Sequence, residues 1–411
     1  MRQLVILGAG TAGTMMANKL RKALPRDAWA ITVFDRDLDH VYQPGLLFLP
    51  FGLYDEADLV RPRALFLGDG IDLQLEPIER IDPDNKALLF KDRDSLQYDV
   101  LIVATGTRIA PEATEGMCGP GWMNTIFDFY SVRGATALRD ALEDWDGGRL
   151  VLNVVDMPIK CPVAPLEFLF LADHFFRERG TREQVELIYA TPLDGAFTKP
   201  RAAAALGDLL ERKGIQMVTE FNTERVDSVD RVLKSYDGTE VPYDLLVTVP
   251  LHYGSRLIGR SGLGDDFDFV PTNKHTLQSN GHPTIFALGD ATDLPTSKAG
   301  SVAHFQAEVL TDNVLRFIEG KPLQPDFDGH ANCFIETGAG KAILIDFNYE
   351  TEPLPGRFPL PGVGPFKLLE ESYVNHWGKL GFKWVYWNLL LRGEELPIDH
   401  KMVLAGKWSQ P

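Results

Sequence analysis

A glycine-rich turn close to the N-terminus limits what this chain can fold into more than any other feature. Gly8, Gly10 and Gly13 lie between the strand-like run LVIL and the helix-like run TAGTMMANKLRKALP. Asp35 ends the next strand-like run, AITVFD. Glycines at this spacing let the backbone approach a pyrophosphate at a helix N-terminus, and an acid at the end of the second strand can bind a ribose. The sequence therefore predicts a Rossmann-like domain that binds a dinucleotide.

The composition excludes several classes of protein. The chain has 411 residues, enough for two or three domains, and a formal net charge of -17. Such acidity argues against a nucleic-acid partner, because phosphate backbones are bound by clustered Lys and Arg. A strand-like run begins almost at Met1, so we expect no signal peptide, and no apolar run is long enough for a transmembrane helix. The three cysteines include no C-x-x-C pair, so neither a disulfide scaffold nor a metal site is expected.

Two distant segments look like copies of each other and indicate a duplicated domain. They read YDVLIVATG from Tyr98 and YDLLVTVP from Tyr243, and each follows a hairpin-like segment. A second Rossmann-like domain would begin at the strand-like run RLVLNVVD and continue through the helix-like run LEFLFLADHFFRERG. Its strand-to-helix turn, MPIKCPVAP, has no glycine, and its second strand ends at Thr191 without a carboxylate. We therefore expect this domain to lack a nicotinamide dinucleotide site.

Three motifs, in this order along the chain, resemble the tandem two-domain FAD-dependent oxidoreductases. They are the glycine turn with Asp35, the A-T-G turn at 104–106 and the A-L-G-D-A segment at 287–291. In that family the A-T-G turn lies near the flavin, and the aspartate of the G-D pair binds FAD. The resemblance implies an FAD site made of Gly8, Gly10, Gly13, Asp35, Thr105, Gly106, Gly289 and Asp290.

The cysteines point to one branch of that family, the sulfide:quinone oxidoreductases. The chain resembles them in the K-C-P turn at 160–162, in a glutamate shortly after it and in a C-terminal cysteine before an apolar residue. A third cysteine upstream, the loop Y-Q-P-G at 42–45 and the segment K-A-G at 298–300 are also similar. The resemblance implies catalytic roles for Cys161, Cys333, Cys118 and Glu167. It adds to the FAD site Pro44, Lys298 and Gly300.

The expected fold class is α/β, with two tandem Rossmann-like domains of the FAD/NAD(P)-binding type and a C-terminal α+β region. The FAD-binding domain is expected over 1–110 and again over 272–324. The second Rossmann-like domain would span 111–271. The C-terminal region, 325–411, would carry Cys333 and an amphipathic aromatic helix.

The resemblance implies an enzyme that oxidises sulfide to sulfane sulfur or polysulfide through a Cys161–Cys333 redox pair and FAD. Two electrons would pass to a membrane quinone. From the residues themselves, Lys160 and the N-terminus of the following helix should both favour the thiolate of Cys161. His304 and Glu167 are the candidates for moving protons. The sequence leaves open whether FAD is linked covalently through Cys118 and whether the chain forms a homo-oligomer.

Other functions would use the same scaffold. One is a flavoprotein sulfide dehydrogenase that donates electrons to a cytochrome, although residues 36–60 lack the early flavin-linking cysteine of that class. Another is an NADH:quinone oxidoreductase, which needs the glycine turn that the second domain has lost. A third is a non-catalytic FAD-binding protein that stores sulfur or acts in regulation.

The aromatic segment YVNHWGKLGFKWVYWNLLLRG is expected to bind a membrane. Its full charges are Lys379, Lys383 and Arg392, which suits the interfacial zone if the lysine side chains reach outward. The alternative is an amphipathic helix buried against its own protein or against a second subunit. On the first interpretation the chain is a peripheral protein of a prokaryotic cytoplasmic membrane, and removal of 376–411 should leave FAD binding and sulfide reduction of the flavin intact.

Overall fold

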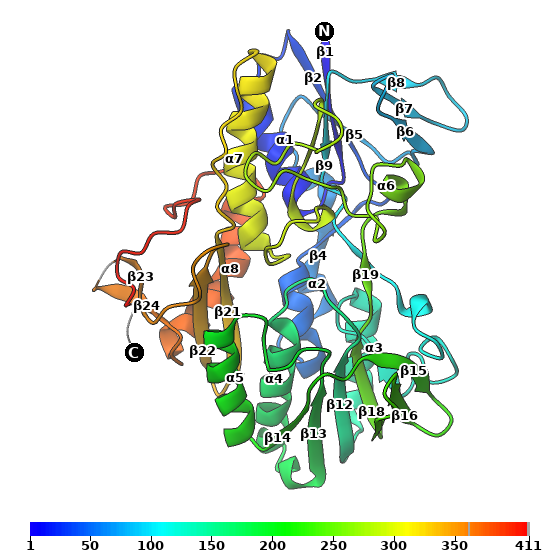
Figure 1. The fold of residues 1–411 in the computed structure, drawn as a ribbon, viewed down its shortest axis with the longest axis vertical. Helices are drawn as coiled ribbons and strands as arrows, with labels where there is room; N and C mark the ends of the chain where they lie inside the picture. The colour runs from blue at the N-terminus through cyan, green and yellow to red at the C-terminus, as the bar shows by residue number, and fades with distance from the viewer. Residues whose placement is uncertain (361, 409–411) are drawn as a thin grey trace.

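Two α/β domains lie one beyond the other along the long axis of the molecule, and a C-terminal sheet and helix lie along one side (Figure 1). The computed structural model describes residues 1–360 and 362–408. The expected α/β class with two tandem Rossmann-like domains is confirmed.

A five-stranded parallel sheet forms the first domain. Its strands read as continuous apolar runs because both faces are covered: Leu4 and Ile6 lie in one buried cluster, and Val5 and Leu7 lie in another. In spatial order the strands are β20 (Ile285–Ala287), β9 (Val100–Val103), β1 (Arg2–Leu7), β2 (Trp29–Phe34) and β5 (Ile71–Gln74). Helices α1 (Thr11–Ala23) and α7 (Gly300–Ile318) pack against each other beside this sheet (Figure 1).

The second domain repeats this plan. Its parallel strands, in spatial order, are β11 (Ile126–Phe127), β18 (Leu245–Val249), β12 (Gly148–Val154), β13 (Val185–Ala190) and β14 (Ile215–Val218). Its helices are α3 (Val132–Glu143), α4 (Ala164–Glu178) and α5 (Pro200–Arg212).

The two YD segments expected to be copies occupy equivalent places. The first becomes β9, which pairs with β1, and the second becomes β18, which pairs with β12. Each follows a three-stranded antiparallel sheet: β6 (Arg80–Asp82), β7 (Ala87–Leu89) and β8 (Leu96–Gln97) in one case, and β15 (Thr223–Asp227), β16 (Val232–Ser235) and β17 (Glu240–Pro242) in the other. The duplication inferred from the sequence is therefore visible in the fold.

The chain crosses between the domains at an antiparallel pair, β10 (Arg108–Ile109) with β19 (His252–Tyr253). Helix α6 (Arg256–Arg260) follows and packs against β6 of the first domain. Ile258 and Val270 share a buried cluster with strands of that domain. The return to the first domain therefore begins at β19, earlier than the boundary expected after residue 271. Near the glycine turn lie a short pair, β3 (Asp39–Val41) with β4 (Val60–Pro62), and α2 (Glu56–Leu59).

The C-terminal region joins the two domains. Its sheet has the order β21 (Ala331–Gly338), β22 (Lys341–Phe347), β24 (Gly364–Leu368) and β23 (Gly356–Leu360). β21 packs against α4 of the second domain and against α7 of the first. Helix α8 (Tyr373–Val385) covers β22 and β21, and a π-helical turn over Tyr386–Leu390 continues it.

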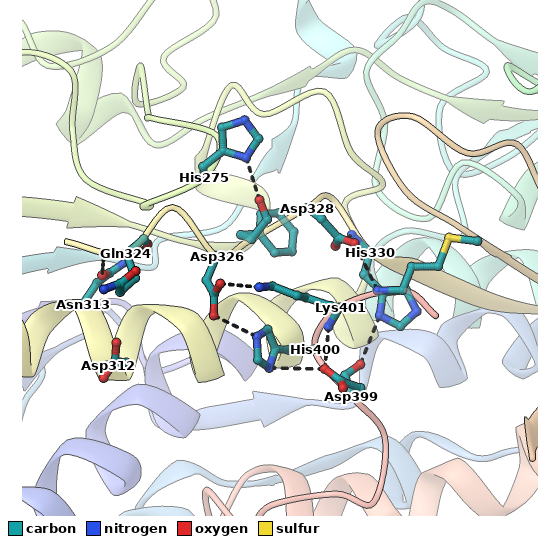
Figure 2. Close-up of polar contacts among 12 residues, drawn as sticks. His275, Asp312, Asn313, Gln324, Asp326, Asp328, His330, Asp399, His400 and Lys401 are labelled. Carbon is teal, nitrogen blue, oxygen red and sulfur yellow. Dashed lines mark hydrogen bonds and ion pairs between the residues drawn. The ribbon is translucent and has the colours of Figure 1, made fainter. Parts of the chain in front are cut away.

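The segment that leads into β21 is held by the tail of the chain (Figure 2). Asp326 contacts both Lys401 and His400. The His330 ring lies 2.7 Å from an Asp346 carboxylate oxygen and 3.2 Å from the Asp399 carbonyl oxygen. These contacts, buried at His330 and exposed at Lys401, hold the entry to the strand that carries Cys333.

The aromatic C-terminal helix is divided between core and surface. Tyr386 and Trp387 are buried, whereas Trp377 and Trp384 are 68% and 62% exposed. Lys383 forms an ion pair with Asp58 (Nζ to Oδ1 2.9 Å), and Lys379 also points into the protein. The expectation that both lysines reach outward is therefore wrong, because Lys379 pairs with the buried Glu167 and Lys383 pairs with the partly exposed Asp58. No helix within 1–360 or 362–408 is long and apolar enough to cross a bilayer.

Candidate active site

The glycine turn after β1 has the shape that a pyrophosphate needs. A Cβ on Gly8 (φ +96°) would lie 2.4 Å from the Ala104 carbonyl oxygen, and one on Gly13 would lie 1.8 Å from the Gly8 carbonyl oxygen. A Cβ on Gly10 would meet no atom within 4 Å. Gly8 and Gly13 therefore let strand, turn and helix pack closely, while Gly10 faces open space before the N-terminus of α1.

Asp35 stands beside this turn, as expected. Its carboxylate accepts hydrogen bonds from the backbone N–H of Ala9 (2.6 Å) and of Arg36 (2.7 Å). Arg63 pairs with the same carboxylate at 3.0 Å and donates to the Ala9 carbonyl oxygen at 2.6 Å. The buried Arg63 was not foreseen from the sequence, because a single arginine in a loop carries no motif.

Other residues predicted to bind FAD follow two neighbouring strands of the same sheet: Thr105 and Gly106 follow β9, and Gly289 and Asp290 follow β20. These two turns and the glycine turn are called the cradle below. The hydroxyls of Thr105 and Thr107 are buried and have no hydrogen-bond partner within the described residues. Gly106 has φ +64° and open space around its Cβ position, and Gly289 has φ +67°. Burial raises the pKa of Asp290, against the effect of Lys298 and Lys160. Because buried polar atoms normally find partners, the unpaired hydroxyls and open glycines fit a polar ligand such as FAD.

Three predicted loops meet between this cradle and the second domain. The backbone N–H of Cys161 donates to the Lys298 carbonyl oxygen (2.8 Å). The Lys298 ammonium donates to the Thr292 carbonyl oxygen (2.6 Å), and burial lowers the pKa of Lys298 to about 8. Lys160 Nζ donates to Gln43 Oε1 (3.0 Å), next to Pro44. The K-C-P turn therefore contacts both the loop of Pro44 and the segment that leads to Gly300, the first residue of α7.

Cys161 and Cys333 come together from different domains. Cys161 precedes α4 in the left-handed conformation (φ +46°), and Cys333 lies buried on β21, which packs against α4. Burial raises the pKa of Cys161 to about 12. Burial also raises the pKa of Cys333, and the charge of Cys161 adds to that rise. Both are free thiols in this structure.

A buried ion pair lies beside these thiols. Lys379 of α8 binds the Glu167 carboxylate of α4 and donates to the Phe334 carbonyl oxygen at 3.0 Å. Glu167 Oε1 also accepts a hydrogen bond from the backbone N–H of Glu336 (2.7 Å). Lys379 lowers the pKa of both thiols, whereas Glu167 raises it. Lys379 is therefore the cation that lowers the thiol pKa, where the sequence pointed to Lys160. Burial outweighs it, so the expected preference of Cys161 for the thiolate is not found.

Two predicted residues lie away from this cluster. Cys118 is exposed on a loop that pairs with β15 through the bridge from Glu115 to Arg225. No contact within the described residues joins Cys118 to the other two cysteines or to the FAD cradle. His304 is buried on α7, where burial and Lys19 lower its pKa to about 4. Order along the sequence could not show on which side of the second sheet the Cys118 loop lies.

The turn after β12 is built differently from the turn after β1. Pro165 lies in the first turn of α4 and lacks an N–H, and the Ala164 N–H already bonds to the Cys161 carbonyl oxygen (2.8 Å). Glu167 adds a buried carboxylate in the same turn of the helix. A pyrophosphate would therefore meet few free donors and a like charge here.

Comparison with known proteins agrees with this geometry. Residues 2–152 match the pyridine nucleotide-disulphide oxidoreductase family. The chain is 28% identical over 422 residues to the mitochondrial sulfide:quinone oxidoreductase of Schizosaccharomyces pombe, which covers 95% of this chain and 90% of that protein. It is 25% identical over 398 residues to the mitochondrial sulfide:quinone oxidoreductase of Mus musculus, with 95% and 86% covered.

The fold also agrees with a solved structure. The sulfide:quinone oxidoreductase of Aquifex aeolicus is similar with a TM-score of 0.79 at 19% identity, over 96% of this chain and 92% of that one. The relatives include mitochondrial and bacterial proteins, so they do not single out the prokaryotic membrane expected from the sequence. The chain is a homologue of the sulfide:quinone oxidoreductases and has the fold of the pyridine nucleotide-disulphide oxidoreductases.

Proposed function

We propose that this protein oxidises sulfide to sulfane sulfur at Cys161 and Cys333 and passes two electrons through FAD to a quinone. One observation carries the proposal. Cys161 stands just before α4, and Cys333 lies on β21, which packs against α4 beside the Lys379–Glu167 pair and next to a cradle that fits FAD. The named relatives supply the substrate class and the acceptor.

The chemistry begins with the oxidised site, in which a sulfur bridge joins Cys161 and Cys333. Hydrosulfide attacks one sulfur of the bridge, a new S–S bond forms and the old one breaks, which leaves a persulfide on one cysteine and a thiolate on the other. The Lys379 ammonium stabilises the anion, because a buried charge interacts strongly with an opposite charge nearby. FAD, when bound, takes up the two electrons that sulfide loses and transfers them to the quinone.

The second Rossmann-like domain supports sulfide over NADH as the electron donor. Its turn offers Pro165 and the Glu167 carboxylate at the place where a nicotinamide dinucleotide would need free N–H groups. No specific contact favours a cytochrome partner or a purely storage role.

Peripheral membrane association belongs to the same proposal. The exposed side chains of α8 include Tyr373, Val374, Trp377 and Trp384. Leu360 and Val363, in the hairpin of β23 and β24, are also exposed. Aromatic rings favour the headgroup zone of a bilayer, and a quinone dissolved in lipid must be reached there.

The direct test is anaerobic addition of sulfide to the FAD-loaded protein while the flavin absorbance is followed. Sulfide should bleach the flavin within the mixing time of seconds, and a short-chain quinone should restore the absorbance. An equal concentration of NADH should bleach it far more slowly. Bleaching by NADH at a rate comparable to that by sulfide would contradict the proposal.

A further inference from the structure

The segment that follows α8 lies against α1, the helix that begins in the glycine turn. Asn18 of α1 donates from Nδ2 to the Leu391 carbonyl oxygen (2.7 Å). A Cβ on Gly393 would lie 3.0 Å from the backbone nitrogen of Lys19, so the two segments pack closely. Residues 386–394 are called the C-terminal strap below.

The first residue of the strap reaches the glycine turn itself. The Tyr386 hydroxyl is hydrogen-bonded to the hydroxyl of Thr11 (2.7 Å), the first residue of α1. The same Tyr386 hydroxyl is hydrogen-bonded to Nε2 of His40 (2.6 Å). Tyr386 and His40 are each 1% exposed. Burial and the charge of Arg63 lower the pKa of His40 to about 3, so a neutral ring holds the tyrosine hydroxyl against Thr11.

Thr11 stands at the place where a pyrophosphate would bind. Gly10 is the N-cap of α1, and no side chain within the described residues caps this helix. The N–H groups of its first turn therefore remain available to an anion. A Cβ on Gly10 would meet no atom within 4 Å, so the space before the helix is open. A contact that fixes the half-buried Thr11 therefore fixes the edge of this space.

We propose that Tyr386 is a positioning residue for FAD, which holds Thr11 in place so that the C-terminal strap and the cofactor stabilise each other's binding. The inference rests on the FAD site of the proposed function and adds to it a dependence on the far end of the chain. A donor that is already held in position loses less freedom when a ligand binds, which favours the bound state. The coupling is reciprocal, because two binding events that share one contact affect each other equally.

One hydroxyl can be removed without disturbing the packing around it. The Tyr386 ring packs against Trp387 (ring centroids 5.1 Å apart) and Tyr42 (4.8 Å). Tyr386→Phe keeps these ring contacts and loses only the hydrogen bonds to Thr11 and His40. Thr11→Val breaks the same contact from the other side, with a side chain of similar shape.

The test measures how fast FAD leaves the FAD-loaded full-length protein in buffer with enough potassium bromide to release the cofactor, followed by flavin fluorescence. Tyr386→Phe and Thr11→Val should each release FAD about tenfold faster, the usual effect of losing one hydrogen bond near a charged ligand. The double variant should be no faster than Thr11→Val, because Tyr386 acts only through Thr11. Thr11→Ser, which keeps the hydroxyl, should match the unsubstituted protein.

Lys22→Gln is the matched control on the same helix. It removes an ion pair with Glu394 (2.9 Å) at the far end of the strap, about three turns of α1 from Thr11. This variant should release FAD at the normal rate. Normal release from Tyr386→Phe, or effects that multiply in the double variant, would overturn the proposal.

A second measurement follows the strap in place of the cofactor. In the FAD-loaded proteins, the backbone amides of 386–394 should exchange with deuterium several-fold faster in Thr11→Val than in Thr11→Ser. Equal exchange in these two variants would contradict the coupling. Neither measurement uses sulfide or quinone. An unsubstituted protein that holds FAD without being reduced by sulfide would therefore end the proposed function alone, whereas one that takes up no FAD would end both proposals.

Discussion

The turns after β1 and after β12 occupy the same place in two copies of one fold. The first turn is built from glycines, whereas the second is built from prolines and a cysteine. The first has glycines at 8, 10 and 13 and open space before α1. The second has three prolines, a strained Cys161 and a carboxylate in the first turn of α4. Both lie before a helix N-terminus, where the helix dipole favours negative charge. A pyrophosphate fits the first turn, whereas the second holds a buried thiol whose pKa is raised to about 12.

The two turns also differ in where their partners come from. Ala104 and Asp35, which complete the glycine turn, belong to the same domain. The cysteine turn is completed by Cys333 of β21 and Lys379 of α8, both from the C-terminal region. The close packing of the glycine turn therefore depends on its own domain, whereas the surroundings of Cys161 are assembled from distant segments.

The largest expected effect comes from removing a thiol. Cys161→Ser and Cys333→Ser should each lower the rate of sulfide-driven flavin reduction about a thousandfold or more, because thiol exchange needs both sulfurs. FAD content should stay normal, since neither side chain belongs to the glycine turn. Anaerobic stopped-flow absorbance gives the rate. Cys118→Ser is the matched control and should react normally; a normal rate in either of the other two would refute the two-cysteine site.

The glycine turn holds one glycine that leaves room for a cofactor and others that let the backbone pack closely. Substitutions can test these two roles one at a time. Gly10→Val should fold and lose FAD affinity tenfold or more, because a Cβ there enters only the space meant for the cofactor. Gly13→Val should instead destabilise the fold, because its Cβ would collide with the Gly8 carbonyl oxygen. The ratio of flavin to protein and the thermal unfolding midpoint distinguish these results. Equal loss of stability in both variants would contradict the assignment of Gly10 to cofactor binding and of Gly13 to backbone packing.

Thiol reactivity should depend on Lys379 and not on Lys160. Lys379 lowers the pKa of Cys161, so Lys379→Met should raise it and move the alkylation profile to higher pH, with about tenfold less thiolate per pKa unit. Glu167→Gln should move the profile to lower pH, because that carboxylate raises the thiol pKa. Lys160→Met is the control, since its ammonium is held by Gln43. A profile that responds to Lys160→Met alone would restore the sequence-based assignment.

The smallest expected effect concerns the surface of α8. Trp377→Ser with Trp384→Ser should reduce sedimentation with liposomes several-fold and leave sulfide-driven flavin reduction unchanged, because both rings are exposed. Trp387→Ala is the contrast on the same segment. Its ring is buried, so this variant should lose about 3 to 5 kcal/mol of stability. Unchanged sedimentation of the double variant would contradict membrane binding through this face.

The sequence was enough to predict those features that depend on residues close together in the chain. The glycine turn, the duplicated strands and the proline-rich turn at Cys161 are local patterns, and the fold contains all of them. The pairing of Cys161 with Cys333 came only from the family resemblance, because no rule of spacing relates residues so far apart.

The sequence did not reveal the contacts of side chains whose partners lie far away in the chain. Lys379 looked like a charge at a membrane surface, yet it contacts Glu167 of another domain. The Tyr386 hydroxyl is hydrogen-bonded to the Thr11 hydroxyl (2.7 Å) and to Nε2 of His40 (2.6 Å), close to the glycine turn. Removal of 376–411 would therefore disturb both sites, contrary to the expectation from sequence. Helical periodicity shows which residues share a face, but it does not show what that face meets.

The most direct test of the central claim, that the second turn holds sulfur where the first holds a dinucleotide, is mass spectrometry of the protein after anaerobic treatment with sulfide. The account predicts added sulfur on a peptide that contains Cys161 or Cys333, formed in step with the loss of flavin absorbance. The Cys118 peptide should carry none. Full flavin reduction by sulfide with no sulfur on either cysteine, or sulfur on Cys118 alone, would contradict it.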